Sequence, residues 1–340
     1  MGNKNSLEQL RSTRYPLMEA SPHLLFYEKT DRIMRMVLLA LLPSVIASII
    51  FFGLRSLLIY VIAIGTCLIS EFLWFKFRKD TLPKDYSAVV TGVLLAMSLP
   101  ASVPLWYPAL GGAIGIIIAK ELFGGIGRNL LNPALTGRAV LRLVFAKEMS
   151  ANVQPQPFFS LNGLDVVSSA TPLMNVKAGE SLSSGQMIDS LTGLIAGKNA
   201  ETTAILLFLG GMFLLYKKVI TWHIPICMLG TIIIIALFLG KGDLTIVFAH
   251  IFGGATMLGA FFMATDYSTS PTTPKGEIIY GICCGTLLMA WRSFSSTAEG
   301  MTFILLIMNC FVPLIDYLII PRAYGCLLYT SPSPRDSTSS

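Results

Sequence analysis

The sequence predicts an all-α polytopic membrane protein in which about ten transmembrane helices form two inverted halves of five helices each. Three observations lead to this prediction. Hydrophobic residues make up 54% of the chain and charged residues only 13%, and the mean hydropathy of +0.68 exceeds that of a soluble domain with a polar surface. Apolar runs of membrane-crossing length recur along the chain. One long polar segment divides these runs into two groups of five.

The apolar runs are the first element of the prediction. Crossing the hydrocarbon core takes roughly 20 helical residues, because each residue rises about 1.5 Å and the core is about 30 Å thick. The third and fifth runs are short and adjoin Pro or Gly, which favours broken or tilted helices that line protein or a cavity. The ten runs lie near 36–54, 57–75, 86–99, 104–122, 132–146, 203–216, 224–240, 244–264, 276–292 and 300–320.

Polar segments define the domain organisation. Residues 1–33 form an N-terminal arm without an apolar run long enough for a signal-peptide core. The two helical halves occupy residues 34–146 and 203–325, and residues 147–202 form a loop between them that is rich in Ser, Asn, Gly and Thr. A loop of this length in a tightly connected bundle is usually functional or disordered. Residues 326–340 have a Ser/Pro bias without periodicity, and we interpret them as a non-native tail.

Lys and Arg are distributed unevenly between the segments that separate the runs. If the N-terminus is cytoplasmic, most of these basic residues fall on the cytoplasmic side, as the positive-inside rule requires. The protein is therefore predicted to lie in the cell inner membrane with both termini in the cytoplasm and the loop 147–202 outside. An odd number of spans in each half gives the halves opposite orientations. The basic residues form no aromatic-lined basic face, which argues against nucleic-acid binding.

Residues suited to metal or redox chemistry are sparse. The six Cys residues include no C-x-x-C pair and no Cys/His pair, so no metal site and no iron–sulfur cluster is predicted. The glycines of GGIGRN (124–129) follow a membrane helix and not a strand, which argues against a dinucleotide-binding fingerprint. Catalysis by this chain alone is therefore not expected.

The loop contains the polar stretch DVVSSATPL (165–173), which has two interpretations. On local chemistry alone it is a turn in which Ser168 or Ser169 caps a short helix and Pro172 fixes the bend. The second interpretation is a site of covalent modification, and it rests on a resemblance to a known motif.

The same stretch resembles the flavin-transferase acceptor motif D-x-x-(S/T)-G-A-T. Asp165, Ser168, Ala170 and Thr171 occupy matching positions, and Ser169 stands where glycine is usual. In that motif the threonine hydroxyl is esterified to the phosphate of FMN, with FAD as the donor. The resemblance implies covalent FMN at Thr171, attached by a flavin transferase.

Three further segments resemble one membrane protein family. KELFGGIGRNLLNPALTGRAVL (120–141) and FMATDYSTSPTTPKGEIIYG (262–281) are similar to signature segments of the D subunit of the Rnf complex, the membrane-bound ferredoxin:NAD oxidoreductase, and of the related B subunit of the sodium-pumping NADH:quinone oxidoreductase. LIDYLIIPRAYG (314–325) resembles the D-subunit terminus, and the short N-terminal arm also favours the D subunit. The resemblance covers essentially residues 20–325.

The resemblance implies a fold related to urea transporters and a role as an electron-carrying subunit. The complex would couple electron flow from ferredoxin to NAD to the export of Na⁺ or H⁺, with the flavin performing the redox chemistry. Riboflavin, bound non-covalently in relatives, is a further cofactor candidate. The implied partners are the other Rnf subunits (A, B, C, E and G), the flavin transferase and membrane lipid. Two alternatives stay open, namely the quinone-reductase B subunit and a cofactor-free, urea-transporter-like channel, and the channel leaves the acceptor motif unexplained.

Helix breaks and ionisable side chains near the spans are candidates for ion or cofactor binding. Around Asn132-Pro133 and Pro271–Pro274, helix ends expose backbone groups that can bind an isoalloxazine edge or an ion, although the nearby glycines also suit close helix packing. An ionisable group inside a membrane is costly, so a functional role is its default interpretation. Asp266 and Glu71 are therefore predicted as ion-pathway candidates, with pairing to nearby Lys or Arg as the competing interpretation.

Overall fold

The structure, a computed structural model, describes residues 30–79, 85–155, 172–177, 185, 197–199, 204–295, 297 and 299–319. Within this part of the chain the regular structure is helical, and strand pairing is limited to an isolated bridge between Val153 and Gly197. The predicted all-α class is confirmed. The principal helices are α2 (Thr30–Arg78), α3 (Ser87–Ser98), α4 (Trp106–Ile114), η2 (Gly115–Glu121), α5 (Pro133–Val144), α6 (Ala146–Met149), α7 (Pro172–Lys177), α9 (Ala204–Tyr216), α10 (His223–Leu239), α11 (Leu244–Phe252), α12 (Thr256–Leu258), η4 (Gly259–Met263), α13 (Pro274–Phe294) and α14 (Met301–Leu318).

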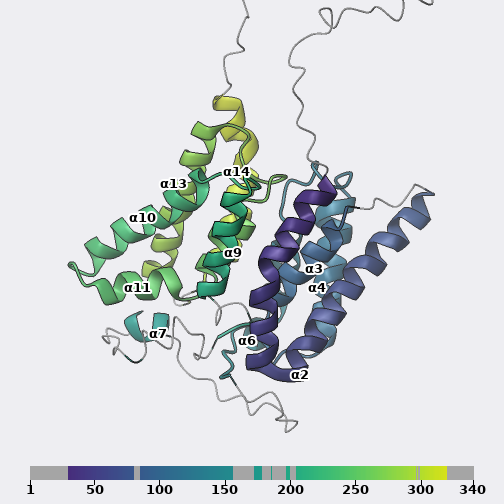
Figure 1. Cartoon of the computed structure of the whole chain (residues 1–340), viewed down its shortest axis with the longest axis horizontal. Helices are drawn as coiled ribbons and strands as arrows, with labels where there is room; N and C mark the ends of the chain where they lie inside the picture. The colour runs from purple at the N-terminus through teal and green to yellow at the C-terminus, as the bar shows by residue number, and fades with distance from the viewer. Residues whose placement is uncertain are drawn as a thin grey trace, which may run out of the picture.

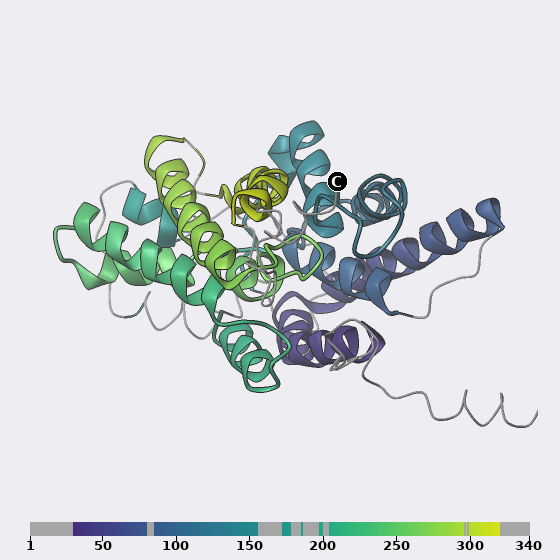
Figure 2. The same ribbon diagram turned by 90° about the horizontal axis from the view of Figure 1, so that it is seen from above.

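The helices form two groups that lie side by side (Figures 1 and 2). The purple-to-teal helices α2 to α5 make up one group, and the green-to-yellow helices α9 to α14 make up the other. Along the seam, α9 packs against α2 and α14 packs against α5. The contact between the groups is therefore made by residues far apart in the sequence.

The longest helix, α2, consists of two arms joined at Gly53. This glycine has φ 68° and ψ −158°, a backbone conformation that residues with a side chain rarely adopt. The two arms coincide with the apolar runs predicted at 36–54 and 57–75, and they meet at the lower edge of Figure 1.

Helix type changes within two of the predicted runs. The run 104–122 begins as α4 and continues as the π-helical segment η2. The run 244–264 is interrupted, because α11 ends at Phe252 and the chain bends by 62° before it continues as α12 and η4. Gly254, with φ 67°, lies in this bend. A hydropathy profile does not indicate such a break, because the residues on both sides of it are apolar.

Helix length and composition identify a membrane protein. Among the described residues, α2 and α14 are long and apolar enough to cross a membrane, and the bent pair formed by α11 with α12 and η4 counts as a third if it is one span. Helices α3, α9 and α10 are apolar but shorter. Large apolar side chains point outward along α2 and α14, as a lipid-facing surface requires; examples are Leu39, Ile46, Ile50, Val61, Ile69, Phe311 and Leu314.

Candidate functional site

Each group of helices contains an interrupted helix with the same local construction. In the first group, the π-helical segment η2 ends at Glu121, a break follows, and α5 begins with Asn132 as its N-cap and Pro133 as its first residue. In the second group, η4 is followed by a break, and α13 begins with Thr273 as its N-cap and Pro274 as its first residue. Single π-helical turns occur frequently at functional sites. The two breaks are therefore the starting point for locating a site.

The side chains at the two N-caps define where the new helices start. The amide oxygen of Asn132 accepts hydrogen bonds from the backbone N–H groups of Ala134 at 3.0 Å and Leu135 at 3.3 Å. The hydroxyl of Thr273 accepts one from the N–H of Gly276 at 3.1 Å. The proline that follows each cap has no N–H and therefore leaves no donor unpaired. Both breaks consequently end in ordered helix starts.

The two breaks contact each other. The side-chain amide of Asn132 donates to Asp266 at 3.3 Å, and that of Asn129 donates to the hydroxyl of Ser268 at 3.1 Å. Asp266 also accepts from the Ser268 hydroxyl at 3.1 Å. Polar residues of the first break thus bind polar residues of the second, at a point where the two groups of helices meet.

A cavity of about 80 Å³ lies beside this contact. Its walls come from both groups, because residues of α2, α3 and η2 face residues of α9, η4 and the second break. Most of the lining is apolar. The polar side chains of the lining are Ser87, Thr91, Lys120, Asn129, Asn132, Thr265, Asp266, Tyr267 and Ser268.

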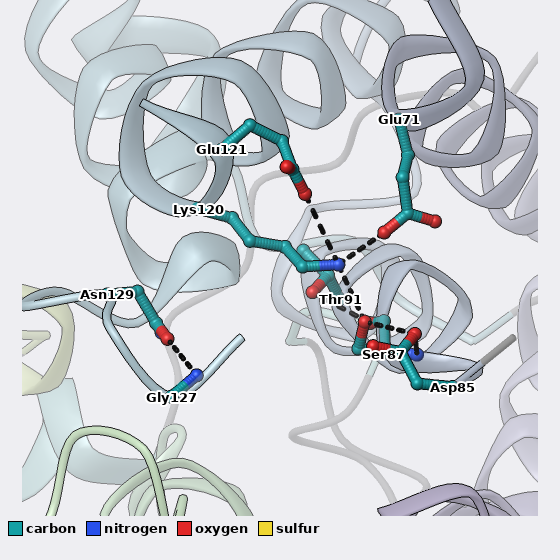
Figure 3. Close-up of polar contacts among 8 residues, drawn as sticks. All are labelled: Glu71, Asp85, Ser87, Thr91, Lys120, Glu121, Gly127 and Asn129. Atoms are coloured by element: carbon teal, nitrogen blue, oxygen red, sulfur yellow. Dashed lines mark hydrogen bonds and ion pairs between the residues drawn. The ribbon is translucent and has the colours of Figure 1, made fainter. Parts of the chain in front are cut away.

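Lys120, at the edge of this cavity, is only 2% exposed and lies among carboxylates (Figure 3). Its ammonium donates to a carboxylate oxygen of Glu71 and to the hydroxyl of Ser87, the latter at 2.6 Å. A carboxylate oxygen of Glu121 lies 3.6 Å from the same ammonium. The Ser87 hydroxyl donates in turn to Asp85 at 2.8 Å. One ammonium is therefore shared by a network that contains three carboxylates, more negative charge than it can balance.

The charge balance of this network suits a mobile cation or a proton. Glu71 and Glu121 are both buried, and buried carboxylates are stable only when they are paired, hydrogen-bonded or protonated. Glu121 Oε1 is buried and accepts no hydrogen bond within the described part of the chain. Throughout the described part of the chain, no group of three or more His, Cys, Asp or Glu side chains is placed to share a metal ion. The network is thus anionic without being a closed metal centre.

A second cavity, of about 240 Å³, lies beside α7 and α11. Arg292 reaches into this region from α13 and donates to the backbone carbonyls of His250 at 2.7 Å and Gly253 at 3.3 Å, and to the hydroxyl of Thr256 at 2.7 Å. Arg292 thus binds carbonyl groups at the C-terminal end of α11, where a cation is favourable. The lining consists of Leu173, Val176, Leu239, Ile246, His250, Arg292 and Ser293.

The short helix α7 lies against α11 of the second group of helices (Figure 1). The side chain of Leu173 lies over the backbone at Gly253 and Gly254, in the bend after α11. The amide of Asn152, in the segment after α6, approaches the sulfur of Met174 to 3.9 Å. Residues 172–177 are therefore held beside the second cavity, with a contact to the segment after α6.

Comparison with known proteins decides the family. The family model described as NQR2, RnfD, RnfE matches residues 17–325. The chain belongs to the NQR2, RnfD, RnfE family. The resemblance based on the segments 120–141, 262–281 and 314–325 is thereby confirmed.

Two relatives show how fully the chain matches this family. It is 40% identical over 311 residues to the D subunit of the Na(+)-translocating ferredoxin:NAD(+) oxidoreductase complex of Acetobacterium woodii, an alignment that covers 91% of this chain and 95% of the relative. It is 36% identical over 342 residues to the D subunit of the ion-translocating oxidoreductase complex of Salmonella arizonae, covering 90% of this chain and 97% of the relative. Both alignments span nearly the whole of each protein.

Of the two predicted ion-pathway residues, one lines the first cavity and the other is joined to it by an ion pair. Asp266 lines the cavity directly, and Glu71 is joined to it through Lys120. Lys120 and Glu121, which belong to the charged network at this cavity, were not predicted as site residues. The available signal was a Lys-Glu pair at the end of an apolar run, a costly position for two charges.

The predicted flavin-attachment residues lie outside the described residues. These are Asp165, Ser168, Ser169, Ala170 and Thr171, and the described chain resumes at Pro172. Arg292 and His250, which line the neighbouring cavity, were not predicted as cofactor-binding residues. They come from α13 and α11, whose approach to α7 has no signature in the sequence.

Proposed function

We propose that this chain is the D subunit of an Rnf-type ferredoxin:NAD oxidoreductase and carries electrons through FMN esterified to Thr171. The complex would export Na⁺ or H⁺ at the expense of electron flow to NAD. Family membership supports this proposal, as do two relatives that are named as D subunits of ion-translocating oxidoreductase complexes. Ferredoxin and NAD would bind the other Rnf subunits, because the sequence lacks a dinucleotide-binding fingerprint and a cysteine cluster.

The observation that carries the proposal is the position of α7 directly after the acceptor motif. Thr171 is covalently bonded to Pro172, the first residue of α7, so a group esterified to Thr171 is held at the start of this helix. α7 packs against α11 and contributes Leu173 and Val176 to the cavity of about 240 Å³. A flavin attached at Thr171 therefore has a cavity within its neighbourhood.

The side chains around this cavity fit FMN chemically. An isoalloxazine is a flat, largely apolar ring, and four aliphatic side chains of the lining offer it an apolar surface. Arg292 supplies a buried cation for a phosphate or for the negative charge of a reduced flavin. The bound FMN would supply the electron-transfer chemistry. The residues of the chain would orient it and restrict the access of water.

The finer topology is part of the proposal. It consists of ten crossings in two inverted halves with a urea-transporter-like arrangement, both termini in the cytoplasm and the loop 147–202 on the outer side of the cell inner membrane. The repeated order of π-helical segment, break, N-cap and proline supports an internal repeat. An odd number of crossings per repeat gives opposite orientations, as in other inverted-repeat membrane proteins.

The first cavity suits the ion-handling side of the function. Glu71 and Asp266 would provide carboxylate oxygens along the path of the cation, and Lys120 would compensate their charge in its absence. Oxygen ligands are those that hard monovalent and divalent cations prefer.

The attachment of FMN is tested by fluorescence on a denaturing gel. Wild-type chain, coexpressed with its flavin transferase, should give a band that fluoresces under ultraviolet light, and Thr171→Ala should remove this fluorescence without reducing the amount of protein. Thr192→Ala, in the same loop but outside the motif, is the matched control and should remain fluorescent. A dark wild-type band would favour the cofactor-free channel.

Electron acceptors separate the two redox alternatives. Membranes with the complete complex should reduce NAD with reduced ferredoxin, and Thr171→Ala should abolish this activity. Quinone reduction with NADH, insensitive to ferredoxin, would instead identify the B subunit of the quinone reductase.

A further inference from the structure

The last residues of the loop 147–202 that the structure describes, 197–199, are fixed to the first group of helices. We call these three residues the strap. Gly197 pairs with Val153 through two backbone hydrogen bonds of 3.2 and 3.0 Å. The backbone N–H of Asn199 donates to Leu99 at 3.3 Å, and its side-chain amide donates to Ala96 at 3.1 Å. The strap thus lies at the end of α3.

The middle residue of the strap is a buried lysine that is bound to a carboxylate. Lys198 is 1% exposed and forms an ion pair with Glu299, which precedes α14. The same carboxylate oxygen lies 3.2 Å from a guanidinium nitrogen of Arg142 and 3.5 Å from one of Arg138, both on α5. Glu299 therefore joins three elements, namely the strap, the first group of helices through α5, and the start of α14 in the second group.

The strap is connected to α7 by a continuous series of contacts. Val153, which pairs with the strap, is preceded by Asn152, whose amide approaches Met174 of α7. α7 in turn lies over Gly253 and Gly254 through Leu173. The strap thus pairs with Val153, and α7 contacts Asn152. These two anchors are adjacent residues of the chain.

The negative charge of Glu299 stabilises the contact between the strap and the helices. A lysine that is almost fully buried is stable only with a charged or hydrogen-bonding partner, and Glu299 supplies a carboxylate to Lys198. Removing that carboxylate leaves three basic side chains close together without the anion that they share. The strap can then recover solvation for Lys198 by detaching from α3, whereas α5 and α14 are held in place by the rest of the bundle.

We propose that Glu299 is a positioning residue for the flavin: its carboxylate holds the strap through Lys198, and the strap holds Val153 and Asn152, which contact α7, the helix that follows the flavin-acceptor threonine. The proposal rests on the proposed attachment of FMN at Thr171. Glu299 is not among the residues that line the second cavity, so it acts through the strap.

Accessibility of Lys198 to trypsin tests the anchor directly and without the flavin. The complex is purified in detergent, treated briefly with trypsin, and its peptides are identified by mass spectrometry. The wild type should resist cleavage after Lys198 because this residue is buried. Glu299→Gln should be cleaved there several-fold faster, and Glu299→Asp, which keeps the charge, should stay close to the wild type. Glu148→Gln is the matched control, because it removes an exposed carboxylate from the neighbouring helix α6.

Quenching of flavin fluorescence by iodide tests the consequence for the cofactor. Glu299→Gln should raise the quenching constant of the covalently bound flavin, since it releases the strap, while Glu299→Asp and Glu148→Gln should not.

The outcomes separate the two proposals. A wild-type band without fluorescence would overturn the attachment of FMN at Thr171. The trypsin result would still test the anchor formed by Glu299 and Lys198. Unchanged cleavage after Lys198 in Glu299→Gln would overturn the anchor itself. Faster cleavage together with an unchanged quenching constant in Glu299→Gln would overturn the role of Glu299 in positioning the flavin.

Discussion

The side-chain amide of Asn132 donates a hydrogen bond of 3.3 Å to the carboxylate of Asp266, a residue 134 positions later in the chain. The same asparagine caps α5 through its amide oxygen. One side chain therefore defines the start of a helix and also links the two interrupted helices at the first cavity. This relationship permits a test that separates structure from function.

Exchanging the side chains of Asn132 and Asp266 should restore the hydrogen bond between these two positions but not the transport of ions. Asn132→Asp keeps a cap acceptor but places two carboxylates together, and we expect a loss of stability of about 1–2 kcal/mol from the lost hydrogen bond and the repulsion. Adding Asp266→Asn re-forms an amide–carboxylate pair and should recover most of the thermal stability of the detergent-solubilised complex. Ion transport in the double variant should remain low, because the carboxylate has left position 266. Full transport activity in the double variant would remove Asp266 from the ion pathway.

Loss of the Lys120 ammonium should destabilise the chain strongly. Lys120→Met leaves Glu71 and Glu121 buried without their shared counter-charge, and breaking a buried pair in this way costs about 3–5 kcal/mol. The double variant Lys120→Met/Glu71→Gln should be more stable than Lys120→Met alone, since it removes one of the stranded charges. Thermal unfolding measures both effects. Lys275→Met, at an exposed lysine in the first turn of α13, is the control and should change the stability little.

Gly137 should not tolerate a methyl group. A Cβ at this position meets the backbone carbonyl of Gly111, with the carbonyl carbon at 3.0 Å, so α5 and α4 must separate. Overpacking of this kind costs about 1–3 kcal/mol. Gly65→Ala is the matched control, because a Cβ there has no neighbour within 4 Å and alanine raises helix propensity. We expect Gly137→Ala to lower the melting temperature and Gly65→Ala to leave it unchanged or raise it; equal effects would contradict the close packing at Gly137.

Arg292 should be required for the bend after α11. Arg292→Met removes the hydrogen bonds to the carbonyls of His250 and Gly253 and to the hydroxyl of Thr256, and hydrogen bonds from a charged donor are worth about 1.5–3 kcal/mol each. We expect lower thermal stability and, in flavin-loaded protein, an altered flavin emission spectrum. Ser293→Ala is the control on the same cavity, because the Ser293 hydroxyl donates only to Met289 of its own helix among the described contacts, at 2.9 Å. A flavin spectrum unchanged in Arg292→Met would place the flavin elsewhere.

Composition and hydropathy predicted the parts of this protein that depend on local physics. The apolar runs predicted the helices, because a helix satisfies its backbone hydrogen bonds within one segment and needs only apolar side chains to face lipid. The segments 120–141 and 262–281 indicated the family from short motifs alone. Asp266 and Glu71 could be selected as candidates because a charge in an apolar run is costly wherever the run is placed.

Other features have no local signal. The bend of 62° after α11 lies between two apolar segments, so hydropathy merges them into one run. The partner of Lys120 could have been any of several carboxylates, and only the packing of η2 against α2 and α3 selects Glu71 and the Ser87 hydroxyl. The link from Lys198 to Glu299 likewise joins residues from different elements.

The sequence by itself determined that this chain is a helical membrane protein of the NQR2, RnfD, RnfE family and which residue types are available for ion and flavin chemistry. The tertiary structure decided that the two helix breaks meet at one cavity, that Lys120 pairs with buried carboxylates, and that α7 packs against α11 beside the second cavity. The physical reason is that side-chain periodicity and hydropathy are local, whereas the pairing of a buried charge depends on which distant segment packs against it.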